Sequence, residues 1–286
     1  MSEFGRNQAG LEPDFERRFG GLRRLYGHEG AQRIFESHVV VVGLGGVGSW
    51  AAEALARSGV GRISLVDMDH VSESNINRQI HATSETVGAS KVQAMQQRIG
   101  LINPQAHVQL LDDFVTPNNW ASVVQQLHTS GGALAVIDAC DQTTAKTAMA
   151  AWAVMHKACF VTVGAAGGKR LAHAVDCADL ADTTHDPLLA QVRYRLRKHH
   201  GAARKGRMGV TCVFSRESVM QPAQVCEAAD SPSNDGSLNC HGYGSSVAVT
   251  ATFGQCAAGW VLDALAQGRG VLRAPPTFGK ELRPQV

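Results

Sequence analysis

Three residues with opposite charges, Arg78, Lys91 and Asp141, could perform phosphate chemistry if the fold brings them to one place. Phosphoryl or adenylyl transfer needs cations that offset the charge developing on the phosphates, and a carboxylate that holds Mg²⁺. A guanidinium, an ammonium and a carboxylate supply that combination. The sequence therefore predicts catalytic roles for all three residues and a Mg²⁺-binding role for Asp141.

A glycine-rich turn could bind the phosphates themselves. Gly43, Gly45 and Gly48 have the GxGxxG spacing, with Gly46 as an additional glycine, and they follow the run HVVVV. Such a turn needs positive φ angles and lets the backbone approach a phosphate, which the free amides of the next helix would face. Many Rossmann-like proteins carry this pattern, and a purely structural turn is the alternative.

A dinucleotide dehydrogenase is another interpretation of this turn. That class would need little more than an acidic residue about 20 positions further on, and Asp67 satisfies the requirement. Because hydride transfer has no use for Arg78, Lys91 and Asp141 as a set, these residues favour nucleotide-dependent group transfer instead.

The segments around these residues alternate between strand and helix patterns. Strands are predicted at 38–42, in the apolar run that ends at Asp67, and at 108–114, 133–138 and 159–164; helices are predicted from about 47 and over 88–102, 116–128 and 143–157. This alternation predicts an α/β, Rossmann-like fold with a mostly parallel sheet and helices on both faces. The carboxyl ends of parallel strands share one edge, so we expect Asp141 to lie beside the glycine turn.

The chain divides into three parts. Residues 11–176 are predicted to form the nucleotide-binding core, beginning with a helix over 11–35 that is broken at Gly20 and Gly21. Residues 177–270 are predicted to form a C-terminal elaboration. It contains helix and loop over 179–209, a strand at 210–215, a mobile loop over 221–239 and an apolar helix within 243–266. A short strand is expected at 171–175, and residues 271–286 read as an irregular tail.

Composition excludes several classes of protein. The net charge of +2 over 286 residues gives no global argument for nucleic-acid binding. Seven cysteines without a CxxC pair argue against a disulfide framework and against the usual four-cysteine zinc site, and no zinc is expected. A reducing, cytoplasmic location follows, since the start of the chain also lacks the apolar core of a signal peptide. The segment 243–266 favours a buried or dimer-interface helix over a membrane span, and peripheral membrane contact stays open.

Longer motifs resemble a known family. The run from 43 to 79, GLGGVGSWAAEALARSGVGRISLVDMDHVSESNINRQ, together with VGASK (87–91) and INP (102–104), resembles the ATP-binding domain of the E1-like, ThiF/MoeB-type adenylating enzymes. This resemblance implies an E1-type adenylation fold that binds ATP and Mg²⁺. Carried over to this sequence, the nucleotide-binding set is Gly43, Gly45, Gly46, Gly48, Asp67, Asp69, Asn75, Arg78, Gln79 and Lys91, with Asp141 as the Mg²⁺ ligand.

Within that superfamily, several stretches are similar to the tRNA threonylcarbamoyladenosine dehydratase branch. They are RFGGLRRLYG (18–27), DDFVTPNN (112–119), DPLLAQVRYRLRK (186–198), GVTCVFSRE (209–217) and VTATFG (249–254). The branch implies ATP-dependent cyclisation of N6-threonylcarbamoyladenosine in tRNA through a carboxyl-adenylate. Two alternatives stay open: an adenylyltransferase for a ubiquitin-like sulfur-carrier protein, and a non-enzymatic nucleotide-sensing scaffold.

A tRNA substrate should leave an electrostatic trace on the protein. The predicted tRNA-binding residues are Lys169, Arg170, Arg193, Arg195, Arg197, Lys198, Arg204, Lys205 and Arg207, and Tyr194 could stack on a base. The alternative is an ordinary solvated helix and loop.

The resemblance also implies a homodimer. In such a dimer Arg18 or Arg24 could reach a phosphate of the neighbouring subunit, although clustered arginines are more often a solvated face. Cysteine desulfurase or sulfur-acceptor proteins are considered as further partners, and a monovalent cation as a further ligand near the C-terminal segment. The mechanism needs no enzyme thiol, so we expect the cysteines to be structural.

Overall fold

A computed structural model describes residues 13–127, 134–220 and 243–270. The run of valines in β1 (His38–Val42) explains why this strand lies in the interior of the sheet, where it is buried along its whole length. Side chains alternate across a strand. Val39 and Val41 therefore pack into the core on one face, whereas Val40 and Val42 pack into the core on the other.

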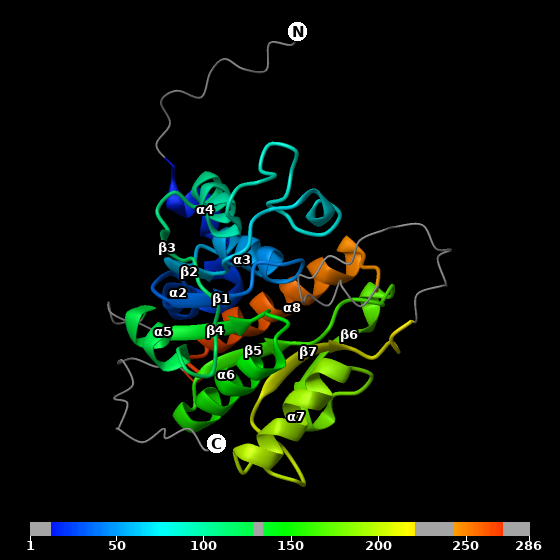
Figure 1. Cartoon of the computed structure of the whole chain (residues 1–286). Helices are drawn as coiled ribbons and strands as arrows, with labels where there is room; N and C mark the ends of the chain where they lie inside the picture. Colours follow the sequence, from blue (N-terminus) through cyan, green and yellow to red (C-terminus); the bar gives the residue numbers. More distant parts are fainter. Residues whose placement is uncertain (1–12, 128–133, 221–242, 271–286) are drawn as a thin grey trace, which may run out of the picture.

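The seven described strands form one sheet in the order β3-β2-β1-β4-β5-β7-β6 (Figure 1). Their bounds are Arg62–Val66 for β2, His107–Leu111 for β3, Leu134–Asp138 for β4, Cys159–Val163 for β5, Val175–Asp179 for β6 and Thr211–Ser215 for β7. All neighbouring strands are parallel except β6, which pairs antiparallel with β7 at the edge. The prediction of a mostly parallel α/β sheet is confirmed.

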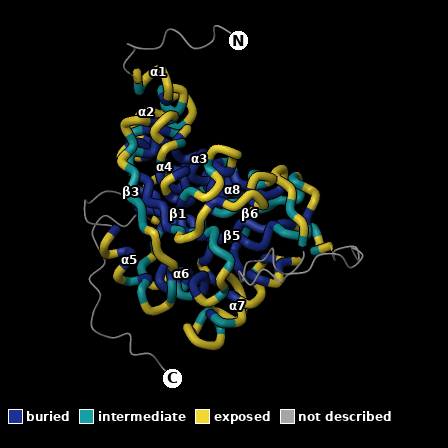
Figure 2. Tube along the Cα trace, turned by 45° about the horizontal axis from the view of Figure 1, so that its top comes forward, coloured by how far each residue is buried: buried dark blue, intermediate teal, exposed yellow. Residues whose placement is uncertain are grey.

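Helices cover both faces of the sheet. One core contains residues from α1 (Phe15–Phe19), α2 (Gly21–Phe35), α3 (Gly48–Arg57), α4 (Lys91–Ile102) and α8 (Val247–Ala266). The opposite core contains residues from α5 (Trp120–Leu127), α6 (Thr143–His156) and α7 (Pro187–His199). Figure 2 shows the buried interior around β1, α3 and α8, with exposed segments outside it.

Several boundaries differ from the expectations, and the helix expected over 116–128 begins only at Trp120. The strand expected at 171–175 is a 3₁₀ helix, Ala172–Ala174, followed by β6. The helix expected from Gly88 begins at Lys91 because Gly88 has φ +87°, which a right-handed helix does not tolerate. The third strand, expected at 108–114, ends at Leu111, and the residues that follow are outside the strand.

The C-terminal part continues the same sheet, because β6 and β7 extend it beyond β5. Helix α8 is buried against α3, as expected for a buried apolar helix, and Gly254 allows the close approach: a Cβ there would meet the Val47 carbonyl oxygen at 2.5 Å. Within the described ranges, no helix has the length and apolar character that a membrane crossing requires. The loop predicted at 221–239 and the tail at 271–286 lie outside the described residues, as do Cys226 and Cys240.

Candidate active site

The glycine-rich turn 43–48, named the phosphate turn for the role that the sequence predicts, lies where the order of the strands reverses. From β1 the chain moves to β2 and β3 on one side, then returns to β4 on the other, and ligands bind at such a switch point in open α/β sheets. Gly43 has φ +87°, and a Cβ there would lie 2.8 Å from the Cys140 backbone nitrogen. The turn after β1 and the turn after β4 therefore touch, and only glycine allows that contact.

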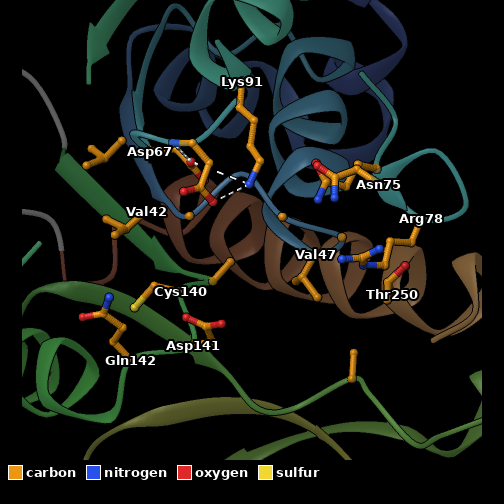
Figure 3. A pocket seen from close by; sticks show the side chains of 18 of the residues that line it. Val42, Val47, Asp67, Asn75, Arg78, Lys91, Cys140, Asp141, Gln142 and Thr250 are labelled. Atoms are coloured by element: carbon orange, nitrogen blue, oxygen red, sulfur yellow. Dashed lines mark hydrogen bonds and ion pairs between the residues drawn. The ribbon is translucent and has the colours of Figure 1, made fainter. Parts of the chain in front are cut away.

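The predicted nucleotide-binding residues surround one pocket of about 440 Å³ (Figure 3). Its lining includes Gly43, Gly45, Gly46, Asp67, Asp69, Asn75, Arg78, Gln79, Lys91 and Asp141. The fold thus brings together the whole predicted set except Gly48. A Cβ at Gly48 would collide with the Gly43 carbonyl oxygen, so its role is packing within the turn.

Lys91 and two acidic residues form one side of the pocket. The Lys91 ammonium at the start of α4 lies 2.7 Å from Asp69 Oδ2 and 3.9 Å from Asp67 Oδ1. Asp67 also accepts hydrogen bonds from the backbone N–H groups of Leu44, at 2.5 Å, and Asp69, at 2.9 Å. Burial raises the pKa of Asp67, while Lys91 and these N–H donors oppose the rise. The arrangement fixes a carboxylate pair beside the phosphate turn.

Arg78 and Asn75 form another part of the wall. Asn75 ends the 3₁₀ helix Glu73–Asn75, and its Oδ1 accepts a hydrogen bond from the Ser72 backbone N–H. The Arg78 guanidinium donates to the Ser74 carbonyl oxygen at 2.8 Å. Trp50 of α3 donates its indole N–H to the Arg78 carbonyl oxygen at 2.9 Å, which ties this segment to the helix behind the phosphate turn.

Asp141 extends from the turn after β4. Figure 3 shows it with Cys140 and Gln142 across the pocket from Lys91. No cluster of three or more candidate metal ligands occurs in the part of the chain that the structure describes. Mg²⁺ is commonly bound by one or two carboxylates together with substrate phosphates. A single carboxylate that lines this pocket therefore fits Mg²⁺ bound in this way.

Several lining residues were missed by the sequence analysis. Asp113, Phe114 and Val115 follow β3, and Thr250 lies in the first turn of α8. The sequence could have indicated Asp113, Phe114 and Val115, because they follow a predicted strand and parallel strands end at the same edge of a sheet. Nothing in residue type or spacing pointed to Thr250. Beyond Asp141, the pocket continues past the residues after β5 to Leu188 of α7.

The structure divides the predicted tRNA-binding residues into those held by hydrogen bonds within the fold and those that face outward. Lys169 belongs to the first group, which corrects the prediction that it contacts tRNA. Lys169 is only 2% exposed, and its ammonium donates to the carbonyl oxygens of His185, at 3.2 Å, and Glu217, at 2.7 Å. Burial lowers its pKa against the attraction of nearby carboxylates. Because its ammonium is enclosed by backbone acceptors, Lys169 does not present a charge to an external phosphate.

Arg193 and Arg197 also hold the fold together. Arg193 Nη1 donates to the carbonyl oxygens of Leu180 and Thr183 and to the Thr183 hydroxyl, each at 3.0 Å. Arg197 Nε donates to the Ala203 carbonyl oxygen at 3.1 Å. These bonds join α7 to the segments that flank it.

The remaining basic residues face outward. Arg170, Lys198, Arg204, Lys205 and Arg207 are exposed and Arg195 is half-buried. A surface hollow of about 340 Å³ is lined by Gln191, Tyr194, Arg195, Lys198 and His199. Tyr194 is 61% exposed, and Lys198 Nζ lies 5.6 Å from the centre of its ring. Cations and an exposed aromatic ring thus share one face of α7.

Neither Arg18 nor Arg24 lines the pocket of its own chain. Arg18 donates a hydrogen bond to the Ile102 carbonyl oxygen at 2.6 Å, whereas the Arg24 side chain is exposed.

The described cysteines lack the environment of a reactive thiolate. Cys159 and Cys212 are buried, and burial raises the pKa of Cys159 to about 12. Cys140 lines the pocket, but burial and the Asp138 carboxylate raise its pKa well above the ordinary value. Reactive cysteines need a lowered pKa, so these thiols are suited to structural roles.

Known proteins share this sequence and architecture. The model of the ThiF family matches residues 18–279. The chain is 44% identical to a tRNA threonylcarbamoyladenosine dehydratase of Escherichia coli strain K12, and the match covers 84% of this chain and 90% of that protein. It is 40% identical to a protein of the same name from Haemophilus influenzae, with 88% and 94% covered.

Solved structures extend the similarity to three dimensions. A crystal structure of the E. coli dehydratase in complex with ATP has a TM-score of 0.76 at 42% identity, covering 88% of this chain and 95% of that one. The same enzyme in complex with AMP has a TM-score of 0.77 at 41% identity, with 91% and 99% covered.

Proposed function

The chain belongs to the ThiF family, and on that basis we propose that it is an ATP-dependent tRNA threonylcarbamoyladenosine dehydratase. The observation that carries this proposal is the gathering of Arg78, Lys91 and Asp141 around one pocket at the switch point of the sheet. The same chain is 44% identical to a dehydratase over most of its length.

ATP would occupy the pocket along the carboxyl edge of the sheet. The backbone of Gly45 and Gly46 borders the space for the phosphates, and Asp67 with Asp69 would bind the ribose hydroxyls. Phe114 and Val115 supply apolar surface for the base. The ATP and AMP complexes of the E. coli dehydratase support this assignment.

The reaction closes a ring in a modified adenosine of tRNA. The carboxylate of the threonylcarbamoyl group attacks the α-phosphorus of ATP and pyrophosphate leaves, which gives an acyl-adenylate. A nucleophilic atom of the same group then attacks the acyl carbon, loses its proton and releases AMP. AMP is a far better leaving group than hydroxide, so activation replaces one difficult step by two easier ones.

Each charged residue has a defined task in this scheme. Arg78 and Lys91, with the Asn75 and Gln79 amides, would bind the phosphates and offset the negative charge that develops as pyrophosphate departs. Asp141 would hold Mg²⁺, which when bound draws charge from the phosphate oxygens. Protein residues supply no covalent intermediate, consistent with the raised pKa of Cys140.

The tRNA would contact the outward-facing basic residues Arg170, Arg195, Lys198, Arg204, Lys205 and Arg207. Helix α7 supports this, because Leu188 near its first turn lines the pocket while Arg195 and Lys198 lie further along its exposed face. Phosphate contacts by such cations dominate the affinity of proteins for nucleic acids.

Further proposals concern the assembly and its surroundings. We propose a homodimer in which Arg24 or Arg18 reaches the site of the partner subunit, and a monovalent cation near the C-terminal segment. A cysteine desulfurase or sulfur-acceptor protein remains the proposed protein partner, and the cytoplasm the proposed location. Sulfur transfer is not required by the ring closure itself.

Mass spectrometry of tRNA nucleosides tests the proposed function. Threonylcarbamoylated tRNA incubated with the protein, ATP and Mg²⁺ should lose the mass of one water at the modified adenosine, and omission of ATP should abolish that loss. An unchanged nucleoside would contradict the proposal. ATP–pyrophosphate exchange that depends on a small protein ending in Gly-Gly would instead favour the sulfur-carrier adenylyltransferase.

A further inference from the structure

A buried ion pair lies directly behind the turn that carries Asp141. Asp138 is the last residue of β4 and Lys146 lies in the first turn of α6, and both side chains are 0% exposed. The Lys146 ammonium is 3.1 Å from Asp138 Oδ1, 3.3 Å from the Asp138 carbonyl oxygen and 3.1 Å from the Thr162 hydroxyl of β5. One ammonium therefore joins two strands and a helix.

The Asp138 carboxylate extends this network to the pocket wall. Its Oδ2 accepts a hydrogen bond from the Thr162 hydroxyl at 2.6 Å. Its Oδ1 accepts from the Cys140 backbone N–H at 3.3 Å and from the Cys140 thiol at 3.1 Å. Cys140 lines the pocket and directly precedes Asp141. The network thus fixes the backbone that presents Asp141.

Asp138, Lys146 and Thr162 do not line the pocket, so they do not touch a ligand there. Burial by itself would lower the pKa of Lys146, but attraction to Asp138 outweighs it and the pKa is raised, so the ammonium stays charged. Buried ion pairs contribute little net stability and can often be replaced by apolar residues of similar volume without loss. Stability alone is therefore a weak explanation for a charged pair at this place.

We propose that Lys146, together with Asp138 and Thr162, is a positioning residue that holds the 139–142 turn so that Asp141 meets Mg²⁺ and the nucleotide phosphates. The inference rests on the proposed function, in which Asp141 binds Mg²⁺. Mg²⁺ demands nearly ideal octahedral geometry, and groups that orient a metal ligand typically change metal affinity by about 10- to 100-fold when removed. A loosened turn would therefore weaken the Mg²⁺–ATP complex more than ATP itself.

Isothermal titration of ATP, with and without Mg²⁺ and in the absence of tRNA, tests the proposal. For Lys146→Met, the tightening of ATP binding that Mg²⁺ produces should fall by about tenfold or more, while Mg²⁺-free ATP affinity stays near the wild-type value. Lys146→Arg should retain part of the Mg²⁺ effect. An unchanged Mg²⁺ effect in a folded Lys146→Met protein would overturn the proposal.

A double variant separates positioning from stability. Asp138→Asn combined with Lys146→Met removes both charges and leaves no unpaired ion, so thermal stability should recover relative to Lys146→Met. The Mg²⁺ effect on ATP binding should remain reduced. If the double variant regained both stability and the wild-type Mg²⁺ effect, the pair would be structural only and the proposal would fail.

Thr162→Val provides a milder test if the charged variants do not fold. It removes one hydroxyl that donates to Asp138 and should reduce the Mg²⁺ effect by a smaller factor than Lys146→Met. The matched control is Thr147→Val, because Thr147 lies in α6 next to Lys146 and its hydroxyl donates to the Thr143 carbonyl oxygen, at 2.7 Å, rather than to Asp138. If Thr162→Val and Thr147→Val showed the same Mg²⁺ effect on ATP binding, the proposal would be overturned.

These titrations are independent of tRNA turnover. A wild-type chain that left threonylcarbamoylated tRNA unchanged would contradict the proposed function, whereas the ATP and Mg²⁺ titrations would still decide the role of Lys146.

Discussion

Lys91 is both part of the fold and part of the proposed chemistry. Its ammonium is held 2.7 Å from Asp69 Oδ2 at the edge of the pocket, and its side chain is only 8% exposed. Replacing it by methionine keeps most of the volume but removes the cation that offsets phosphate charge. We expect Lys91→Met to lower dehydration of threonylcarbamoylated tRNA by about 10²- to 10³-fold.

Single-turnover mass spectrometry of the tRNA nucleoside measures this loss. Asp141→Asn should show a comparable defect. The control is Arg17→Met, which removes an exposed cation from a surface pair with Asp14 and should leave turnover unchanged. Full turnover by Lys91→Met would rule out its assigned role.

His81 should make stability depend on pH. The side chain is 2% exposed, and burial together with Lys91 and Arg98 lowers its pKa from 6.5 to about 4. The unfolded chain takes up a proton near pH 6.5, whereas the folded chain resists protonation until about pH 4. Its contribution is therefore fully present above pH 6.5 and is lost as the pH falls toward 4, by about 3 kcal/mol in total.

Urea unfolding at several pH values between 7.5 and 4 checks this expectation. The free energy of unfolding of His81→Gln should fall less steeply than that of the wild type across this window, because glutamine does not titrate. Identical slopes for the two proteins would show that His81 is not protonated differently in the folded and unfolded chains.

Gly43 and Gly45 of the phosphate turn are needed for different reasons. Gly43 needs its φ of +87° and its contact with the turn after β4, so Gly43→Ala should destabilise the fold. A Cβ on Gly45 would meet no protein atom within 4 Å, yet Gly45 lines the pocket. Gly45→Ala should therefore keep the wild-type Tm and weaken ATP binding by about tenfold or more, because the methyl group keeps a phosphate from the backbone.

Calorimetry distinguishes these two variants, with Tm taken from thermal unfolding and ATP affinity from titration. Gly88→Ala is a useful comparison, since Gly88 has the same φ of +87° and nothing near its Cβ position but does not line the pocket. It should lower Tm without a specific effect on ATP. Loss of stability in Gly45→Ala would contradict the expected division of roles.

The basic residues predicted to contact tRNA divide between the interior of the fold and its surface. Lys198 is exposed beside Tyr194, whereas Lys169, which follows β5, is enclosed by carbonyl oxygens. Lys198→Glu should raise KM for tRNA severalfold, more so at low salt, without changing KM for ATP. Lys169→Met should lower Tm instead, since it removes the hydrogen bonds that Lys169 donates to the His185 and Glu217 carbonyl oxygens. A larger tRNA defect in Lys169→Met than in Lys198→Glu would reverse this assignment.

The proposed dimer can be tested by mixing subunits. If Arg24 acts on the partner's site, Arg24→Ala and Lys91→Met are each defective, but a mixed dimer contains one site with both groups intact. When equal amounts of the two variant subunits exchange at random, half of the dimers contain one subunit of each kind. Each mixed dimer has one complete site out of two, so about a quarter of wild-type turnover should return. Subunit exchange is verified first. If turnover then does not recover, Arg24 does not act on the partner's site.

The architecture explains why residues far apart in the sequence meet. Strands β1 and β4 are neighbours although β2 and β3 lie between them in the chain, and the Gly43 turn therefore touches the turn that carries Asp141. Arg78 and Lys91 come from the connection that leaves β2 at the same edge. One mostly parallel sheet with a reversal in strand order thus assembles most of the pocket.

Sequence alone determined the sheet, the helices around it and most of the pocket. These features depend on local patterns: valines that alternate between two cores, glycines at a turn, and polar residues placed just after strands. Because parallel strands end at a common edge, the positions of Asp67, Arg78, Lys91 and Asp141 along the chain were sufficient to predict that they meet.

Only the tertiary structure decided which charged residues are available to a ligand. Lys169 and Lys198 are both lysines in basic stretches, yet one is enclosed by backbone acceptors and the other is exposed. Lys146 carried no signal in the sequence, because its role depends on Asp138 and Thr162 from two different strands. Burial and hydrogen bonding are properties of how distant segments pack, and local spacing does not specify them.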